Sequence, residues 1–168
     1  MGSFRLLNFA DDHGAARPGI LVGGKTVVDL QQALPGRAWA TSTLAALNAW
    51  DTALPALHAL ADAPAGATRP LASVCLLAPL LYPPAIYCTG ANYMDHAEEM
   101  SPEKKGVDKA TTQPYLFLKS AAHCVIGPGD AIRLPNVSDK VDWEGEFAVV
   151  IGRRARNVKV ADAMQYVA

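Results

Sequence analysis

The feature that most limits how this chain can fold is a proline-punctuated segment near its middle. Residues 62–84 read DAPAGATRPLASVCLLAPLLYPP and hold much of the chain's proline, around an apolar run at 74–81. Proline interrupts helices and central strands, and such stretches are typical of domain boundaries. We therefore expect an α+β, mostly β protein, with a small N-terminal α+β domain over residues 1–75 and a second domain over 76–168.

Apolar runs bounded by glycine, proline and polar residues predict the strands. In the first part Gly23-Gly24 separates the runs 19–22 and 25–29, a pattern typical of a hairpin. The expected strands are 4–9, 19–22, 25–29, 85–89, 114–119, 131–134 and 141–151.

Leucine and alanine at three-to-four spacing predict two helices, over 41–50 and 52–61. Thr41 or Ser42 can cap the first. Pro55 fits only if it lies in the first turn of the second helix, because a proline further in lacks the N–H that the helix needs. This alanine-rich part shows no clustered polar groups, so we expect no site in it.

Composition excludes several function classes. Hydrophobic residues make up 51% of the chain, charged residues 18%, and the formal net charge is −1. This balance fits a packed core and lacks the basic surplus of a nucleic-acid binder. No apolar run in the sequence is long enough to span a membrane. Because acidic residues begin at Asp11 without a long apolar stretch before them, we expect no secretion signal. The three cysteines, Cys75, Cys88 and Cys124, form no zinc pattern and fit reduced thiols. We expect a cytoplasmic protein with no nucleic-acid or membrane partner.

Two carboxylates in the segment VDWEGEFAVVIG, residues 141–152, suggest a cation site. On a strand, Glu144 and Glu146 share one face with Cα atoms roughly 6.5–7 Å apart. They repel each other unless a cation lies between them, and oxygen ligands favour Mg²⁺, Mn²⁺ or Ca²⁺ over zinc. Gly145 leaves room for another group to approach. The alternative is an edge strand with two solvated glutamates.

A second candidate group lies in NYMDHAEEM, residues 92–100, where a helical turn is expected. His96 and Glu99 would then share a face, and a carboxylate beside an imidazole fixes its tautomer and suits it to activate water. Asp95 could instead serve a helix cap with Glu98, so these groups could be purely structural. Lys119 is an isolated cation in an apolar strand, and an edge lysine reaching for solvent is the plain alternative.

Four ordered motifs resemble the fumarylacetoacetate hydrolase family. They are AIYCTGANYMDHAEEM at 85–100, PYLFLKS at 114–120, HCVIGPGDAIRLP at 123–135 and VDWEGEFAVVIGRRARNV at 141–158, and the tail 161–168 resembles the family's following helix. The resemblance covers residues 72–168 well and the N-terminal part loosely. It implies that the second domain is the start of a mixed β-roll, usually found in homodimers.

The resemblance also implies roles for individual residues. Glu144 and Glu146 match two carboxylates that hold a divalent metal, His96 matches the catalytic histidine, and Glu99 its partner. Lys119 matches a lysine that lines the pocket, while Tyr93 is a candidate substrate-binding residue. Asp95 lies near a position where some members supply a further metal ligand.

The family's next motif, whose first aspartate completes the metal site, would begin where this sequence stops at Ala168, so we expect it to be part of a longer protein. The activity implied is a metal-dependent hydrolase that cleaves a carbon–carbon bond in acylpyruvate-like or fumarylacetoacetate-like oxo acids. The alternatives are a decarboxylase or isomerase of a related dioic acid, or a non-catalytic interaction module.

Overall fold

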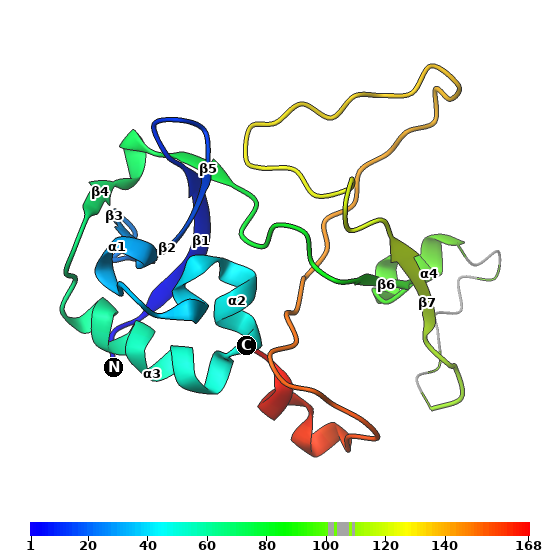
Figure 1. Ribbon diagram of the computed structural model, residues 1–168. Helices are drawn as coiled ribbons and strands as arrows, with labels where there is room; N and C mark the ends of the chain where they lie inside the picture. The colour runs from blue at the N-terminus through cyan, green and yellow to red at the C-terminus, as the bar shows by residue number, and fades with distance from the viewer. Residues whose placement is uncertain (101–102, 104–107, 109) are drawn as a thin grey trace. The chain divides into compact units, whose positions relative to one another are not determined.

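The computed structural model describes residues 1–100, 103, 108 and 110–168, and its backbone divides into two compact units. Unit 1 combines Met1–Leu81 with Ile126–Ala168, and unit 2 is Tyr82–Val125. Figure 1 shows a mixture of helices, antiparallel strands and long irregular segments. The expected division between residues 75 and 76 stays a prediction. Within the described ranges, no helix is long and apolar enough to cross a membrane.

Unit 1 is built on a five-stranded antiparallel sheet in the order β4-β3-β2-β1-β5. Its strands are β1 (Phe4–Ala10), β2 (Ala16–Val22), β3 (Thr26–Asp29), β4 (Thr68–Pro70) and β5 (Cys75–Leu77). The hairpin predicted at Gly23-Gly24 is confirmed, because both glycines have positive φ, at 58° and 69°, and Lys25 N–H donates to the carbonyl of Val22 at 3.2 Å. The sheet thus grows from two consecutive hairpin turns plus two short edge strands from the proline-rich segment.

Both faces of this sheet are buried near its centre, which explains why its strands carry neighbouring apolar residues, Leu6-Leu7, Ile20-Leu21 and Val27-Val28. On one face, Ile20 and Val28 pack with Leu57 of the helical layer. On the other, Phe9 and Val27 pack beneath the chain that follows β4. Adjacent residues of each strand therefore feed opposite cores, as the two-residue period of a strand requires.

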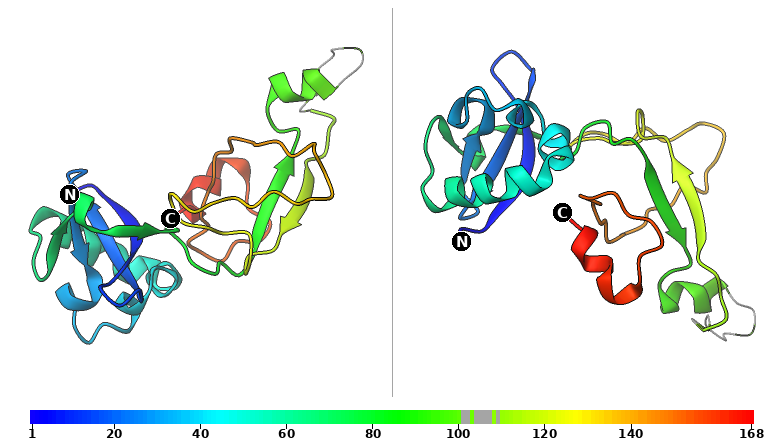
Figure 2. Two further views of the ribbon diagram at one scale, coloured as in Figure 1. Left: turned by 90° about the horizontal axis from the view of Figure 1, so that it is seen from above. Right: turned by 60° about the horizontal axis from the view of Figure 1, so that its bottom comes forward.

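The helical layer covers the first of these faces (Figure 2). Its members are α1 (Leu30–Ala33), η1 (Ala38–Thr41), α2 (Thr43–Asn48) and α3 (Trp50–Asp62), where η marks a 3₁₀ helix. Ser42 caps α2, accepting from the N–H of Ala45 at 3.0 Å, so that expectation is confirmed. The expected start of the second helix at 52 is wrong, since α3 begins at Trp50 and places Pro55 beyond its first turn.

The described residues of unit 2 form a two-stranded antiparallel ribbon and a short helix. Strand β6 (Ile86–Gly90) pairs with β7 (Tyr115–Lys119), and α4 (Met94–Met100) follows β6. The predicted strands at 85–89 and 114–119 and the predicted helical turn are therefore confirmed. All five residues of β7 are exposed, so the ribbon has little core of its own.

Two expected strands are wrong. Residues 131–134 and 141–150 lie in neither helix nor strand, and only Ile151 forms an isolated bridge, to Val167. Their alternating apolar side chains fit a strand, but among the described residues no neighbouring strand pairs with them. Apolar side chains of the second segment lie in solvent, since Trp143 and Phe147 are each 85% exposed. The chain ends in η3 (Val160–Tyr166), so the helix implied for the tail is present in 3₁₀ form.

Candidate active site

The loop between β6 and α4 sets the position of the candidate histidine. Gly90 ends β6 directly against Tyr115, where an added Cβ would lie 2.8 Å from the ring carbon Cδ1. Ala91 then turns the chain with φ of 51°, in the left-handed region that glycine normally occupies. The N–H of Ala97 donates to the carbonyl of Tyr93 at 3.0 Å, and this hydrogen bond marks the start of α4.

On α4 the predicted pair is present. Nδ1 of His96 lies 3.8 Å from Oε2 of Glu99, one helical turn away. This distance is an ion-pair contact and is longer than a hydrogen bond. A proton on Nδ1 facing the carboxylate leaves Nε2 of the neutral ring as a base, and both side chains reach solvent, with His96 47% exposed. The pair can therefore take a proton from a bound molecule.

The two other candidates in unit 2 lie apart from each other. Tyr93 is half-exposed immediately before α4. Lys119 pairs with Ile86, at the end of the ribbon opposite the Gly90–Tyr115 pair that leads into α4. Four residue steps along β6 correspond to ~13 Å. Figure 2 shows α4 beyond the Gly90–Tyr115 end of the ribbon, away from Lys119. The ribbon itself thus does not bring Lys119 beside His96.

Glu144 and Glu146 lie in the irregular segment of unit 1 and are both exposed. Carboxylate oxygens suit a hard divalent cation. However, no group of three or more His, Cys, Asp or Glu side chains gathers anywhere in the part of the chain that the structure describes. Two carboxylates are only part of a donor set, so these residues do not form a complete metal site as arranged.

Sequence reasoning missed an apolar cavity in unit 1, close to His58 and Trp50. The sequence predicts no site in this N-terminal part, because it shows no clustered polar groups. The signal available in the sequence was the spacing of Trp50 and His58, because residues eight apart on a helix lie on the same side of it. His58 does have a structural contact as well, from Nδ1 to the carbonyl oxygen of Gly2 at 2.7 Å.

Comparison with known proteins bears on the second half of the chain. Residues 85–168 match the family model described as fumarylacetoacetate (FAA) hydrolase C-terminal. This range contains all six candidate residues: Tyr93, His96, Glu99, Lys119, Glu144 and Glu146. The comparison tests the family and leaves the individual roles as predictions.

Three relatives illustrate the likeness. A protein of Xenopus laevis named mitochondrial oxaloacetate tautomerase is 43% identical over 96 residues, which are 56% of this chain and 28% of that protein. A Homo sapiens protein of the same name is 41% identical over 100 residues, 59% of this chain and 29% of the relative. An uncharacterized protein of Archaeoglobus fulgidus is 43% identical over 101 residues, 58% and 36% respectively. The chain therefore spans about a third or less of the length of these relatives.

Proposed function

This chain belongs to the fumarylacetoacetate hydrolase family, and on that premise we propose that it interconverts the keto and enol forms of oxaloacetate or of a closely related 2-oxo dioic acid. The names of the frog and human relatives support this substrate class. The observation that carries the proposal is the His96–Glu99 pair on α4, inside the range 85–168 that matches the family model. The residues 85–168 would contribute part of the family's β-roll to the assembled enzyme.

Tautomerisation requires one proton to leave an oxygen and another to reach the neighbouring carbon, or the reverse. Nε2 of His96 would take the proton from the enol hydroxyl and return a proton to C3, giving the ketone with no change in composition. Glu99 would hold the imidazole in the tautomer that leaves Nε2 free, which is the role of a positioning carboxylate. Both steps use general acid–base chemistry that a solvent-accessible imidazole supports.

Charge on the substrate gives Lys119 and Tyr93 their proposed parts. A dioic acid is a dianion, and Lys119 would attract one carboxylate, acting at a distance from His96 along the ribbon. Tyr93 would contact the substrate beside α4. Glu144 and Glu146 would contribute two ligands to a divalent cation, Mg²⁺ or Mn²⁺, which when bound supplies Lewis-acid stabilisation of an enolate oxygen. Homodimer formation, a cytoplasmic location and the domain boundary stay predictions.

The second candidate is the hydrolase that the motifs alone suggested. The same base would remove a proton from water, and the resulting hydroxide would attack the distal carbonyl of an acylpyruvate. The carbon–carbon bond then breaks, and the leaving enolate takes up a proton. His96, with its side chain open to solvent, favours this possibility because water reaches it directly.

An enol-absorbance assay with oxaloacetate tests the proposal. We expect the full chain with Mg²⁺ to accelerate ketonisation above the uncatalysed rate, and His96→Gln to lower that acceleration at least about tenfold, within the range general acid–base groups contribute. Glu98→Gln, an exposed neighbour on the same helix, is the matched control and should retain activity. No acceleration by the full chain, or equal rates for His96→Gln and the parent, would overturn the assignment.

Product analysis separates the alternatives in the same samples. Two carboxylic acids from an acylpyruvate indicate hydrolysis, carbon dioxide from oxaloacetate indicates decarboxylation, and a shifted keto–enol ratio alone indicates tautomerisation. Loss of all three activities would favour a non-catalytic interaction module.

A thermal-shift titration tests the cation proposal independently. Mg²⁺ or Mn²⁺ should raise the midpoint, and oxalate, an enolate mimic, should enlarge the rise by mass action. Glu144→Gln and Glu146→Gln should each reduce it, while Asp139→Asn, an exposed acid in the same segment, should not. A shift unchanged in both glutamate variants would remove them from the site.

A further inference from the structure

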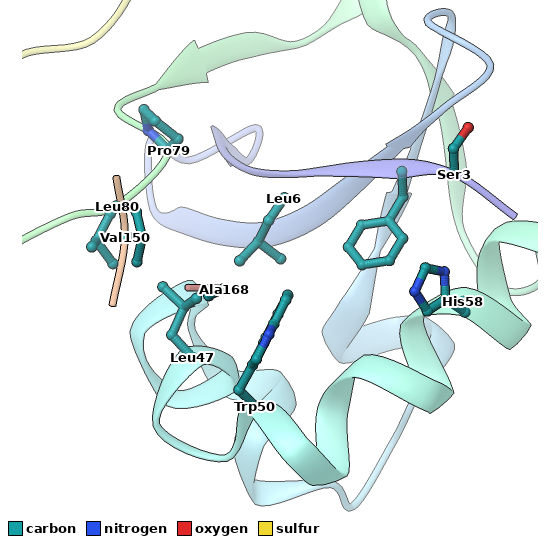
Figure 3. A pocket seen from close by; sticks show the side chains of 10 residues that line it. Ser3, Leu6, Leu47, Trp50, His58, Pro79, Leu80, Val150 and Ala168 are labelled. Atoms are coloured by element: carbon teal, nitrogen blue, oxygen red, sulfur yellow. The ribbon is translucent and has the colours of Figure 1, made fainter. Parts of the chain in front are cut away.

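Unit 1 contains an apolar cavity of about 430 Å³ that no proposed catalytic residue lines (Figure 3). It lies between strand β1, helices α2 and α3, and the segments around residues 79 and 150. The lining side chains that matter here are Phe4, Leu6, Leu47, Trp50, His58 and Val150. An apolar cavity of ~150 Å³ holds one benzene ring, so this one has room for two fused rings.

One wall of the cavity comes from a short antiparallel contact late in the chain. The N–H of Ala168 donates to the carbonyl of Val150 at 2.9 Å, and the N–H of Gly152 donates to that of Tyr166 at 2.8 Å. Arg153 ties this contact to α3, since its Nε donates to Asp51 at 2.8 Å. The wall is therefore fixed by backbone and side-chain bonds together.

Among the described residues, two polar side chains line the cavity, Ser3 and His58, and the proton of the His58 ring can be placed from its contacts. A carbonyl oxygen only accepts, so the 2.7 Å contact with Gly2 places the proton on Nδ1 and makes Nε2 of the neutral ring an acceptor. Phe4 meets the same ring edge-on, with centroids 5.2 Å apart, which holds the imidazole in one orientation. In Figure 3 the ring stands at one end of the lining, opposite Leu47 and Val150.

We propose that this cavity is a binding site for a neutral aromatic molecule of one or two rings that carries a hydroxyl or N–H donor. The rings of Trp50 and Phe4 would pack against the ligand, and Nε2 of His58 would accept its donor. A dianionic oxo acid does not fit, because no lysine or arginine is among the described residues that line the cavity. The site is thus distinct from the proposed catalytic one.

Titration of the full chain with 2-naphthol and with naphthalene, followed by calorimetry and NMR, tests this. We expect one saturable site per chain that binds 2-naphthol at least about fivefold tighter than naphthalene, as one added hydrogen bond allows. His58→Phe should abolish that preference and still bind naphthalene, which also shows that the variant folds.

A second experiment fills the cavity with a larger side chain. Leu47→Trp should weaken both ligands at least about tenfold, whereas Asn48→Trp, an exposed neighbour on α2, should leave both affinities unchanged. Equal affinity for the two ligands in the parent chain, or unchanged binding in Leu47→Trp, overturns the proposal. Binding at many equal sites also overturns the proposal, because it indicates adsorption to exposed apolar side chains. Self-association that covers the cavity overturns it as well, because a second copy of the chain is then the occupant.

Discussion

A buried amide shows most directly what one residue contributes to this fold. Asn8 stands in the middle of β1, only 2% exposed, among apolar neighbours. Its Nδ2 lies 3.0 Å from Oγ1 of Thr43, 3.0 Å from the carbonyl of Ala78 and 3.1 Å from that of Pro79. One side chain therefore joins the sheet, helix α2 and the proline-rich segment, because a buried donor must find acceptors.

Asn8→Asp should destabilise unit 1 by at least about 2 kcal/mol at pH 7, since a buried carboxylate would face two carbonyl oxygens and could donate nothing. Urea unfolding measures this. Thr43→Val, which removes only one acceptor, should cost less. If Asn8→Asp unfolds at the parent's urea concentration, the amide carries none of the stability assigned to it.

A surface ion pair gives unit 1 an acid-sensitive element. Hydrogen bonding to the Arg69 guanidinium, and then its charge, lower the pKa of the Asp12 carboxyl below its ordinary value. Because the folded pKa is the lower one, the pair stabilises the fold above the unfolded value, about 4, and this is lost as pH falls through the folded pKa.

Asp12→Asn should therefore lower the Tm slightly at pH 7 and leave it unchanged near pH 2, while Asp139→Asn should have little effect at either pH. Thermal melts across this range measure the difference. A Tm difference between Asp12→Asn and the parent that persists unchanged at pH 2 would contradict the ion-pair origin. Because both side chains of the pair reach solvent, added salt should also reduce the Tm difference between Asp12→Asn and the parent at pH 7.

At the scale of elements, α2 depends on its first residue. The Ser42 hydroxyl accepts from Ala45 N–H and satisfies one of the orphan donors that begin the helix. Ser42→Ala should cost about 1 kcal/mol in urea unfolding. Thr52→Ala, an exposed threonine in α3, is the comparison and should be neutral or slightly stabilising. Equal stability of Ser42→Ala and the parent would remove the cap from this account.

Helix α3 contains a residue that we expect to destabilise it, in contrast to the Ser42 cap of α2. Pro55 lies inside the helix, where it cannot donate to the carbonyl of Asp51 four residues earlier. It is exposed, so replacing it creates no cavity. Pro55→Ala should stabilise unit 1 by about 1 kcal/mol, less than the full interior penalty because proline also restricts the unfolded chain. A lower unfolding midpoint in Pro55→Ala would show that the proline fits its helix without penalty.

At the scale of the whole molecule, a few contacts join distant stretches of unit 1. Arg153 reaches Asp51 in α3 and, at 2.8 Å, the carbonyl of Gln165. Arg153→Met should raise amide hydrogen exchange over residues 150–168 and change the exchange of β1 and β2 little, since exposed ion pairs add at most about 1 kcal/mol. Arg154→Met is the control. Equal exchange in both variants would contradict this role of Arg153.

The candidate active site was predictable to the extent that it is local. The spacing of His96 and Glu99 is a property of one helical turn, and the structure has them in contact. The placement of Lys119 depends on the register of β7 against β6, which no single segment specifies. Whether Glu144 and Glu146 lie on one face of a strand depends on whether another strand pairs with residues 141–150. The sequence of this segment carries no information about that partner strand.

The sequence by itself determined the features whose causes lie within a few residues. These are the Gly23-Gly24 hairpin, the Ser42 cap and the His96–Glu99 spacing, together with the motifs that identify the family. Only the tertiary structure decided that Asn8 is buried with three acceptors and that residues 141–150 are not a strand. The physical reason is that turns and caps satisfy their own backbone groups, whereas strands and buried polar groups need partners from distant parts of the chain.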